Sequence, residues 1–233
     1  MKNTTRIIAK LALAGAISVV GVTVTGTAAQ AACTDGNIII AKAGKTTYGT
    51  ACDDKIYGTS GNDTIFASSG DDVVYPGEGA DTVFGGNGND DIYSGSGKDV
   101  VYGEAGDDFI MGGTENDYID GGSGGDTIRG EEGNDTLVSF GGANDGSDEL
   151  RGGDGNDYLN GGEGKDNLNG EAGDDTLESH ETNPVYDHLT GGQGKDKFAV
   201  KDVIEHSQAN RDDVDKDNFD FAVTNKNAND TFH

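Results

Sequence analysis

The chain is poor in basic residues and in large aliphatic side chains. It has 16 Lys and Arg against 43 Asp and Glu, which gives a net charge of −27 at pH 7. An acidic surface of this strength repels phosphate groups, which excludes nucleic acid as a partner. From residue 32 onward, Leu, Ile, Val and Phe make up only about 17% of the chain, and such a content combined with high net charge is typical of disordered proteins. The composition alone therefore favours a disordered acidic chain, unless something neutralises the carboxylates.

Tryptophan is absent, and only two cysteines, Cys33 and Cys52, are present. In an oxidising compartment such a pair favours a disulfide, which here would tie the start of the mature chain to the first repeat, with two free cysteines as the alternative. Long hydrophobic runs are also lacking. The apolar stretch 11–24 is shorter than the roughly 20 residues that a membrane-spanning helix needs, so we expect no membrane span in the mature chain.

Residues 1–31 have the order of a secretory signal peptide. A basic start is followed by the apolar stretch and by Ala29-Gln30-Ala31, an A-x-A cleavage site. We predict a Sec-type signal over 1–31, cleavage after Ala31 and an extracellular, secreted product. A membrane anchor and a lipoprotein modified at Cys33 are the alternatives. The signal contains three basic residues and no acidic one, so the remaining chain carries a net charge of −30.

Most of the remaining chain is a nonapeptide repeat, of which Gly85–Tyr93 (GGNGNDDIY) is representative. Ten units run from Gly49 to Val138, four from 143 to 178 and two from 182 to 199, separated by the interruptions 139–142 and 179–181. All sixteen units have Asp at position six and an apolar residue at position eight. Thirteen have Gly at position four, and the exceptions are Cys52, Glu115 and Val185. A fixed short period of this kind predicts a solenoid.

The repeat divides the mature chain into three parts. We predict an N-terminal cap over 32–48 with a strand at 37–41, a repeat domain over 49–199, and a segment 200–233. The last part is either a C-terminal cap, with a strand around 218–224, or a partly disordered tail. Caps of this kind protect the open ends of a solenoid.

Each repeat position has a physical reason. Glycines permit positive φ, so the first six residues are expected to form a tight turn. The residue at position eight points inward from a short strand, while positions seven and nine face outward. If one coil contains two nonapeptides, units two apart stack about 4.8 Å from each other and bring the Asp residues into two columns. These columns would repel each other unless a hard divalent cation binds between them, and Ca²⁺ suits a turn rich in oxygen ligands better than Mg²⁺ does.

The pattern G-G-x-G-x-D-x-U-x over Gly49–Ala199 resembles the RTX family, the hemolysin-type calcium-binding repeat. The resemblance implies an all-β, right-handed parallel β-roll (β-solenoid), in which units two apart share each Ca²⁺ through Asp carboxylates and turn carbonyls. The implied carboxylate ligands are Asp54, Asp63, Asp72, Asp81, Asp90, Asp99, Asp108, Asp117, Asp126, Asp135, Asp148, Asp157, Asp166, Asp175, Asp187 and Asp196. Examples of the carbonyl ligands are Gly86, Gly88, Gly95, Gly97, Gly153, Gly155, Gly162 and Gly164. Because some turns depart from the pattern, we expect about 8–11 calcium ions, bound best within 58–112 and 152–178.

Position nine is aromatic in the first six units. By alternation, we expect Tyr57, Tyr75 and Tyr93 to stack on one outer face, and Phe66, Phe84 and Tyr102 on the other. One interpretation is cross-strand stabilisation by stacked rings. The other is an exposed strip that binds a glycan, a polymer or a second copy of the chain.

Apparent catalytic motifs lack their structural context. Ser123 lies in a G-x-S-x-G match without the strand, turn and helix of a nucleophile elbow. His180-Glu181 begins a zinc-protease motif, but the second His is missing. We therefore expect no enzyme, but a secreted calcium-binding protein that folds on binding calcium. The alternative is a calcium-stabilised structural or adhesive protein of a cell surface or matrix, with a glycan or cell-surface partner for the aromatic strip. A toxin or hydrolase fragment ranks below both, because no catalytic or pore-forming region precedes the repeats.

Overall fold

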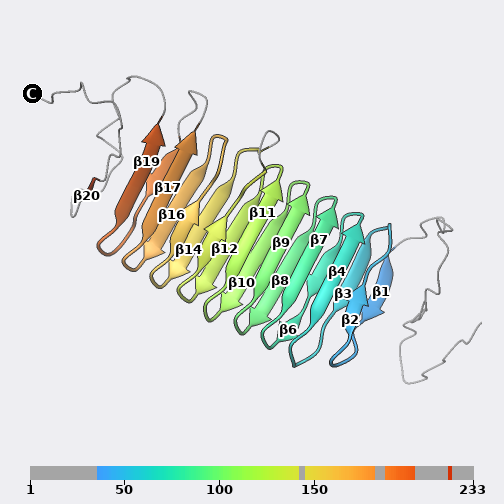
Figure 1. Ribbon diagram of the computed structural model, residues 1–233. Coiled ribbons are helices and arrows are strands. Elements are labelled where there is room, and N and C mark those ends of the chain that lie inside the picture. Colours follow the sequence, from blue (N-terminus) through green and yellow to red (C-terminus); the bar gives the residue numbers. More distant parts are fainter. Residues whose placement is uncertain (1–35, 142–144, 182–186, 203–219, 222–233) are drawn as a thin grey trace, which may run out of the picture.

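The computed structural model describes residues 36–141, 145–181, 187–202 and 220–221, and its regular structure in these ranges consists only of β-strands. Along the chain, successive strands alternate between two sheets, here called sheet A and sheet B, except that β5 and β6 both belong to sheet A and β19 and β20 both belong to sheet B. Figure 1 shows the coils stacked from β1 and β2 (blue) to β19 (orange). Every strand pairing is parallel. The predicted all-β parallel roll is confirmed.

Sheet A contains β1 (Asn37–Ile40), β3 (Asp54–Tyr57), β5 (Val73–Tyr75), β6 (Gly77–Glu78), β8 (Asp91–Ser96), β10 (Phe109–Thr114), β12 (Thr127–Glu132), β14 (Glu149–Asp154), β16 (Asn167–Ala172) and β18 (His188–Thr190). Sheet B contains β2 (Thr46–Tyr48), β4 (Thr64–Ser69), β7 (Thr82–Asn87), β9 (Val100–Ala105), β11 (Tyr118–Ser123), β13 (Thr136–Val138), β15 (Tyr158–Asn160), β17 (Thr176–Glu181), β19 (Lys197–Asp202) and β20 (Asp220–Phe221).

The register of the strands shows the length of one coil. Ile56 pairs with Val74, the position-eight residue two units later, which confirms two nonapeptides per coil. Two coils are longer than the others, one between β12 and β14 and one between β16 and β18. The position-eight residues on either side of both places still pair with each other. The predicted interruption 179–181 is wrong in its position, because these residues continue β17 and pair with β19, so the additional residues of that coil follow Glu181.

The core is a double stack of position-eight side chains. Every one of them from Ile56 to Leu177 is fully buried, whereas positions seven and nine are in most strands partly exposed. Ile39, Leu189 and Phe198 pack against the two ends of the stack. A fully buried aliphatic side chain of this size stabilises a fold by about 1.5–3 kcal/mol, so the thin core becomes substantial only through stacking of many coils.

The turns are shorter than the sequence predicts. Strands such as β8 and β10 continue through positions one to three of the following unit, so the turn comprises positions four to six rather than the first six. The prediction that all six positions form the turn is therefore wrong. The backbone bends at position two with a positive φ, as at Gly113 (φ 111°), yet Gly113 still pairs with its neighbours in sheet A. Because the strand continues past position nine and its side chains alternate, position one faces inward like position eight. Ala67 and Ser94 are fully buried at this position.

Aromatic rings form one ladder on the outer face of each sheet, as expected from the alternation of units. On sheet A, Tyr57, Tyr75 and Tyr93 stack in order; on sheet B, Tyr48, Phe66, Phe84 and Tyr102 do so. Neighbouring ring centroids lie 4.6–5.4 Å apart and the ring planes differ by only 3–13°. Because the rings cover each other's faces, the ladders stabilise the pairing of adjacent coils.

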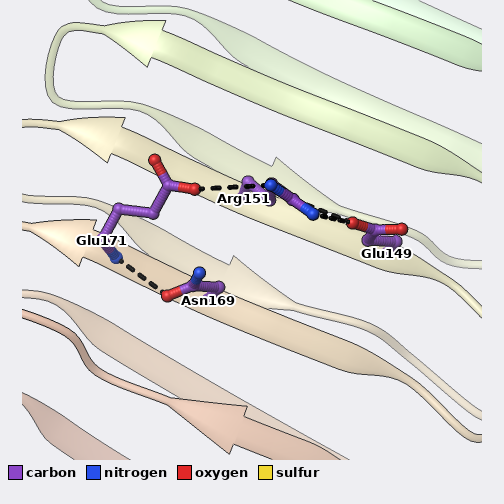
Figure 2. Close-up of polar contacts among 4 residues, drawn as sticks. All are labelled: Glu149, Arg151, Asn169 and Glu171. Carbon is purple, nitrogen blue, oxygen red and sulfur yellow. Dashed lines mark hydrogen bonds and ion pairs between the residues drawn. The ribbon is translucent and has the colours of Figure 1, made fainter.

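Charged side chains continue the outer face of sheet A beyond the rings. The Arg129 guanidinium lies 5.6 Å from the centroid of the Phe109 ring. Figure 2 shows Arg151 between Glu149, to which it donates two hydrogen bonds, and Glu171, 3.9 Å away. These ion pairs are partly exposed to solvent, so we expect them to contribute no more than about 1 kcal/mol.

Removing the central rings tests the structural role of the ladder. We expect the double variant Tyr75→Ser and Tyr93→Ser to lower the free energy of unfolding in calcium by about 2 kcal/mol, since ring pairs contribute roughly 0.5–1.5 kcal/mol each. Urea unfolding in calcium measures this difference. The matched control is Tyr48→Ser, which removes one ring contact at the exposed end of the other ladder. Unchanged stability of the double variant would contradict a structural role.

Strands are present at both ends of the described chain. The strand expected over 37–41 is found as β1, which pairs with β3. In the last segment, β20 pairs with β19. Residues 1–35, including the predicted signal peptide and Cys33, lie outside the described residues. Within the described ranges, no helix could cross a membrane.

Candidate metal centre

The structure gathers the position-six Asp residues into two columns, one in each row of turns. Counting units from Gly49, the odd column contains Asp54, Asp72, Asp90, Asp108, Asp126, Asp148, Asp166 and Asp187, and the even column contains Asp63, Asp81, Asp99, Asp117, Asp135, Asp157, Asp175 and Asp196. Each of these residues lies directly before, or at the start of, the strand that carries its unit's position-eight residue. All of them are buried except Asp187, which is partly exposed.

A ladder of hydrogen bonds orients the carboxylates. Each Asp N–H donates to Oδ1 of the Asp two units later, as Asp90 does to Asp108 at 2.8 Å. Fourteen such bonds of 2.6–3.0 Å run through both columns without a break. The ladder satisfies Oδ1 of every carboxylate except those of Asp54 and Asp63, the first in each column, and holds the second oxygen, Oδ2, in a repeated position.

The second oxygen of most carboxylates is buried and has no hydrogen-bond partner among the described residues. This holds for Oδ2 of Asp72, Asp81, Asp90, Asp99, Asp108, Asp117, Asp135, Asp148, Asp157, Asp175 and Asp187. The corresponding atoms of Asp54, Asp63 and Asp126 instead accept hydrogen bonds from Thr50, Thr59 and Ser139. A buried carboxylate oxygen without a partner is costly, so these positions fit a bound cation.

A position-one glycine leaves space beside six of these oxygens, those of Asp90, Asp108, Asp117, Asp135, Asp157 and Asp175. A Cβ placed on Gly112 would lie 2.5 Å from Asp117 Oδ2 and 2.9 Å from the carbonyl oxygen of Gly130, two units later. The same pair of oxygens, from the same unit and from the unit two later, borders Gly85, Gly103, Gly130, Gly152 and Gly170. Two oxygens from successive coils therefore face one small space, and oxygen atoms are the ligands that Ca²⁺ prefers.

Burial also raises the pKa values of several Asp carboxyl groups in the columns. Loss of hydration raises the pKa of Asp72, Asp108 and Asp148 to about 8, with smaller contributions from neighbouring carboxylates. The pKa values of Asp117 and Asp157 rise to about 7 for the same reasons. Without a cation, these carboxyl groups would therefore hold protons near neutral pH, and a positive charge at Oδ2 would favour their ionised form.

Comparison with protein families identifies the repeat. The family model for the RTX calcium-binding nonapeptide repeat matches residues 48–83, 75–110, 84–119, 102–137 and 140–177, together more than half of the chain. The chain belongs to this RTX family. Comparison with curated proteins gave no match.

The RTX turn accommodates one of the departures from its pattern. The eight glycines predicted as carbonyl ligands, from Gly86 to Gly164, all have positive φ. Glu115 replaces such a glycine at position four but keeps a positive φ of 76°. Its carboxylate also lies close enough to Asp99 and Asp117 to raise their pKa values. The substitution therefore adds negative charge to this part of the even column without breaking the turn. Val185 lies outside the described residues.

A second ladder, at position five of the RTX repeat, was missed by sequence reasoning. Oδ1 of an Asp or Asn at this position accepts the backbone N–H of the position-five residue two units later, as Asn89 does from Asp107. Nine such bonds of 2.7–3.1 Å are present. Nine of the sixteen units have Asp or Asn at position five, and this enrichment could have predicted the ladder. It runs opposite to the position-six ladder, because here the earlier coil supplies the acceptor.

Side chains alone do not complete a metal site. In the described part of the chain, no three His, Cys, Asp or Glu side chains form a group that could hold a metal ion. A cation in an RTX turn of this chain would therefore need backbone carbonyl oxygens, such as that of Gly130, in addition to Asp carboxylates.

Proposed function

We propose that this RTX protein is a secreted calcium-binding β-roll whose folded state depends on calcium ions bound between stacked turns. The observation that carries the proposal is the repeated, buried Oδ2 atom without a partner among the described residues, which in six turns lies next to the space left by a position-one glycine. Calcium ions at these positions would pair with the carboxylates and reduce the repulsion between neighbouring coils. Metal binding would then supply folding free energy that the thin core lacks.

We call the space between two consecutive Asp residues of one column a gap. The unpartnered oxygens indicate which of these gaps would hold calcium. In the odd column, an unpartnered Oδ2 belongs to the gaps that follow Asp72, Asp90, Asp108 and Asp148. In the even column, one belongs to the gaps that follow Asp81, Asp99, Asp117, Asp135, Asp157 and Asp175. These ten gaps agree with the 8–11 ions expected from the sequence. The first gap of each column is left out, because Thr50 and Thr59 donate to Asp54 and Asp63 Oδ2.

Secretion and the disulfide remain predictions from the sequence. A signal over 1–31 and a bond between Cys33 and Cys52 fit a protein that meets millimolar calcium outside the cell. Both involve residues outside the described ranges. The limits 32–48, 49–199 and 200–233 are likewise proposed as cap, roll and final segment.

The aromatic ladders do not favour the adhesive alternative. A glycan packs against the face of an aromatic ring, but in both ladders these faces cover each other, with ring planes nearly parallel. We therefore propose a calcium-binding module rather than a glycan-binding surface.

Calcium titration of the full-length chain tests the proposed function. Calorimetry is expected to give about ten calcium ions per chain, bound cooperatively, and little binding of magnesium at the same concentration, because Mg²⁺ demands a strict octahedral shell. The double variant Asp108→Asn and Asp117→Asn, one residue in each column, should bind fewer ions. A chain that binds no calcium at millimolar concentration would refute the proposal.

A further inference from the structure

Ser139 lies inside the roll, although the repeat register assigns it to an interruption. It directly follows β13, and its N–H donates to the carbonyl oxygen of Asn160 at 3.0 Å, which continues the pairing of β13 with β15. Its side chain is fully buried. Ser139 therefore occupies the place of a position-one residue, and the additional residues of this coil follow it.

The Ser139 hydroxyl lies in the gap between Asp126 and Asp148. These two residues are neighbours in the odd column, since the Asp126 N–H donates to Asp148 Oδ1 at 2.7 Å. Ser139 Oγ donates to Asp126 Oδ2 at 3.1 Å and lies 3.4 Å from the carbonyl oxygen of Gly122. In the gaps proposed to hold calcium, the equivalent Oδ2 has no hydrogen-bond partner in the described structure.

A second serine, Ser94, shows that a serine at position one does not by itself close a gap. Ser94 is also fully buried at position one, but neither its Oγ nor Oδ2 of Asp81, which corresponds to Asp126 one coil earlier, has a hydrogen-bond partner among the described residues. The coil after Ser139 differs, because residues are inserted there. Asp145 anchors that insertion, since its Oδ2 accepts the N–H of Glu163 at 2.8 Å. The insertion thus distinguishes the surroundings of Ser139 from those of Ser94.

We propose that the Ser139 hydroxyl takes the place of a calcium ion between Asp126 and Asp148. This inference rests on the proposed function. It divides the odd column into two calcium-binding segments, one from Asp72 to Asp126 and one that begins at Asp148, whereas the even column is continuous. The interruption in the repeat then acts as a boundary between groups of calcium sites.

Opening the gap should create a calcium site. Ser139→Gly restores the residue most common at position one, and Ser139→Ala removes the hydroxyl alone. Both variants are expected to bind one calcium ion more than the wild type in calorimetric titration. The matched control, Ser94→Gly, should bind the wild-type number, because the gap between Asp81 and Asp99 is already open. Circular dichroism in calcium checks that each variant folds.

The outcomes separate this inference from the function on which it rests. An unchanged number of ions in both Ser139 variants overturns the closure of the gap. One ion fewer overturns it as well and makes Ser139 a calcium ligand. A wild type that binds no calcium refutes the proposed function itself. As a readout without calcium, both Ser139 variants should unfold at lower urea concentration than Ser94→Gly in EDTA at pH 5, where the calcium-free roll is expected to be more stable, because they lose the hydrogen bond to Asp126.

Discussion

Removal of calcium with EDTA at pH 8 is expected to unfold the roll. Each coil contributes only two large apolar side chains to the core, while its Asp residues lie in buried columns of like charge. Ionising these carboxylates without a cation leaves buried negative charges about 4.8 Å from those of the next coil. Circular dichroism should therefore show loss of the β-sheet signal in EDTA and its cooperative return on addition of calcium. Magnesium at matched ionic strength is the control.

The calcium-free chain should become more stable as the pH falls from 8 towards 5. Burial raises the pKa of Asp72, Asp108 and Asp148 in the folded state to about 8, above the ordinary value of 3.8. The folded state therefore binds more protons than the unfolded state between these values, and stability is lost as the pH rises through the folded pKa. With calcium bound the trend should reverse, because protons compete with the ion. Equal thermal stability at pH 8 with and without calcium would contradict the dependence of folding on calcium.

Truncation of one central core residue should also destabilise the roll strongly. Ile110→Ala is expected to lower the free energy of unfolding in calcium by about 3 kcal/mol, since loss of a buried Ile side chain typically costs about 2–5 kcal/mol. Ile110 is fully buried and lies between Ile92 and Ile128 on the adjacent strands of sheet A. The cavity would thus weaken two coil interfaces at once. In a solenoid, where each coil contacts only its neighbours, this should also reduce the cooperativity of unfolding.

Urea unfolding in saturating calcium measures both quantities, as the midpoint and as the slope of the transition. Ile40→Ala is the matched control, because Ile40 is 57% exposed on the end strand β1, and it should change the stability by less than about 0.5 kcal/mol. If the two variants were equally stable, the stacked side chains would not be the apolar core of the roll.

The nonapeptide repeat is enough to predict the plan of this protein. Its period and the alternation of side chains along a strand predict two sheets, a coil of two units, the buried stack from Ile56 to Leu177, and the separate ladders of Tyr75 and Phe84. They also predict the two Asp columns. These features follow from the repeat alone, because identical units stacked at a constant interval bring identical positions together.

How neighbouring coils meet is visible only in the folded molecule. The inward direction of position one, the opposite direction of the position-five ladder and the closure of the Asp126 gap by Ser139 all depend on contacts between residues that are far apart in the sequence. The repeat register places Ser139 outside the pattern, but the pairing of β13 with β15 draws it into the roll. The physical reason is that a backbone N–H or a carboxylate oxygen takes whichever partner the neighbouring coil presents, and an insertion changes that partner without changing the repeat.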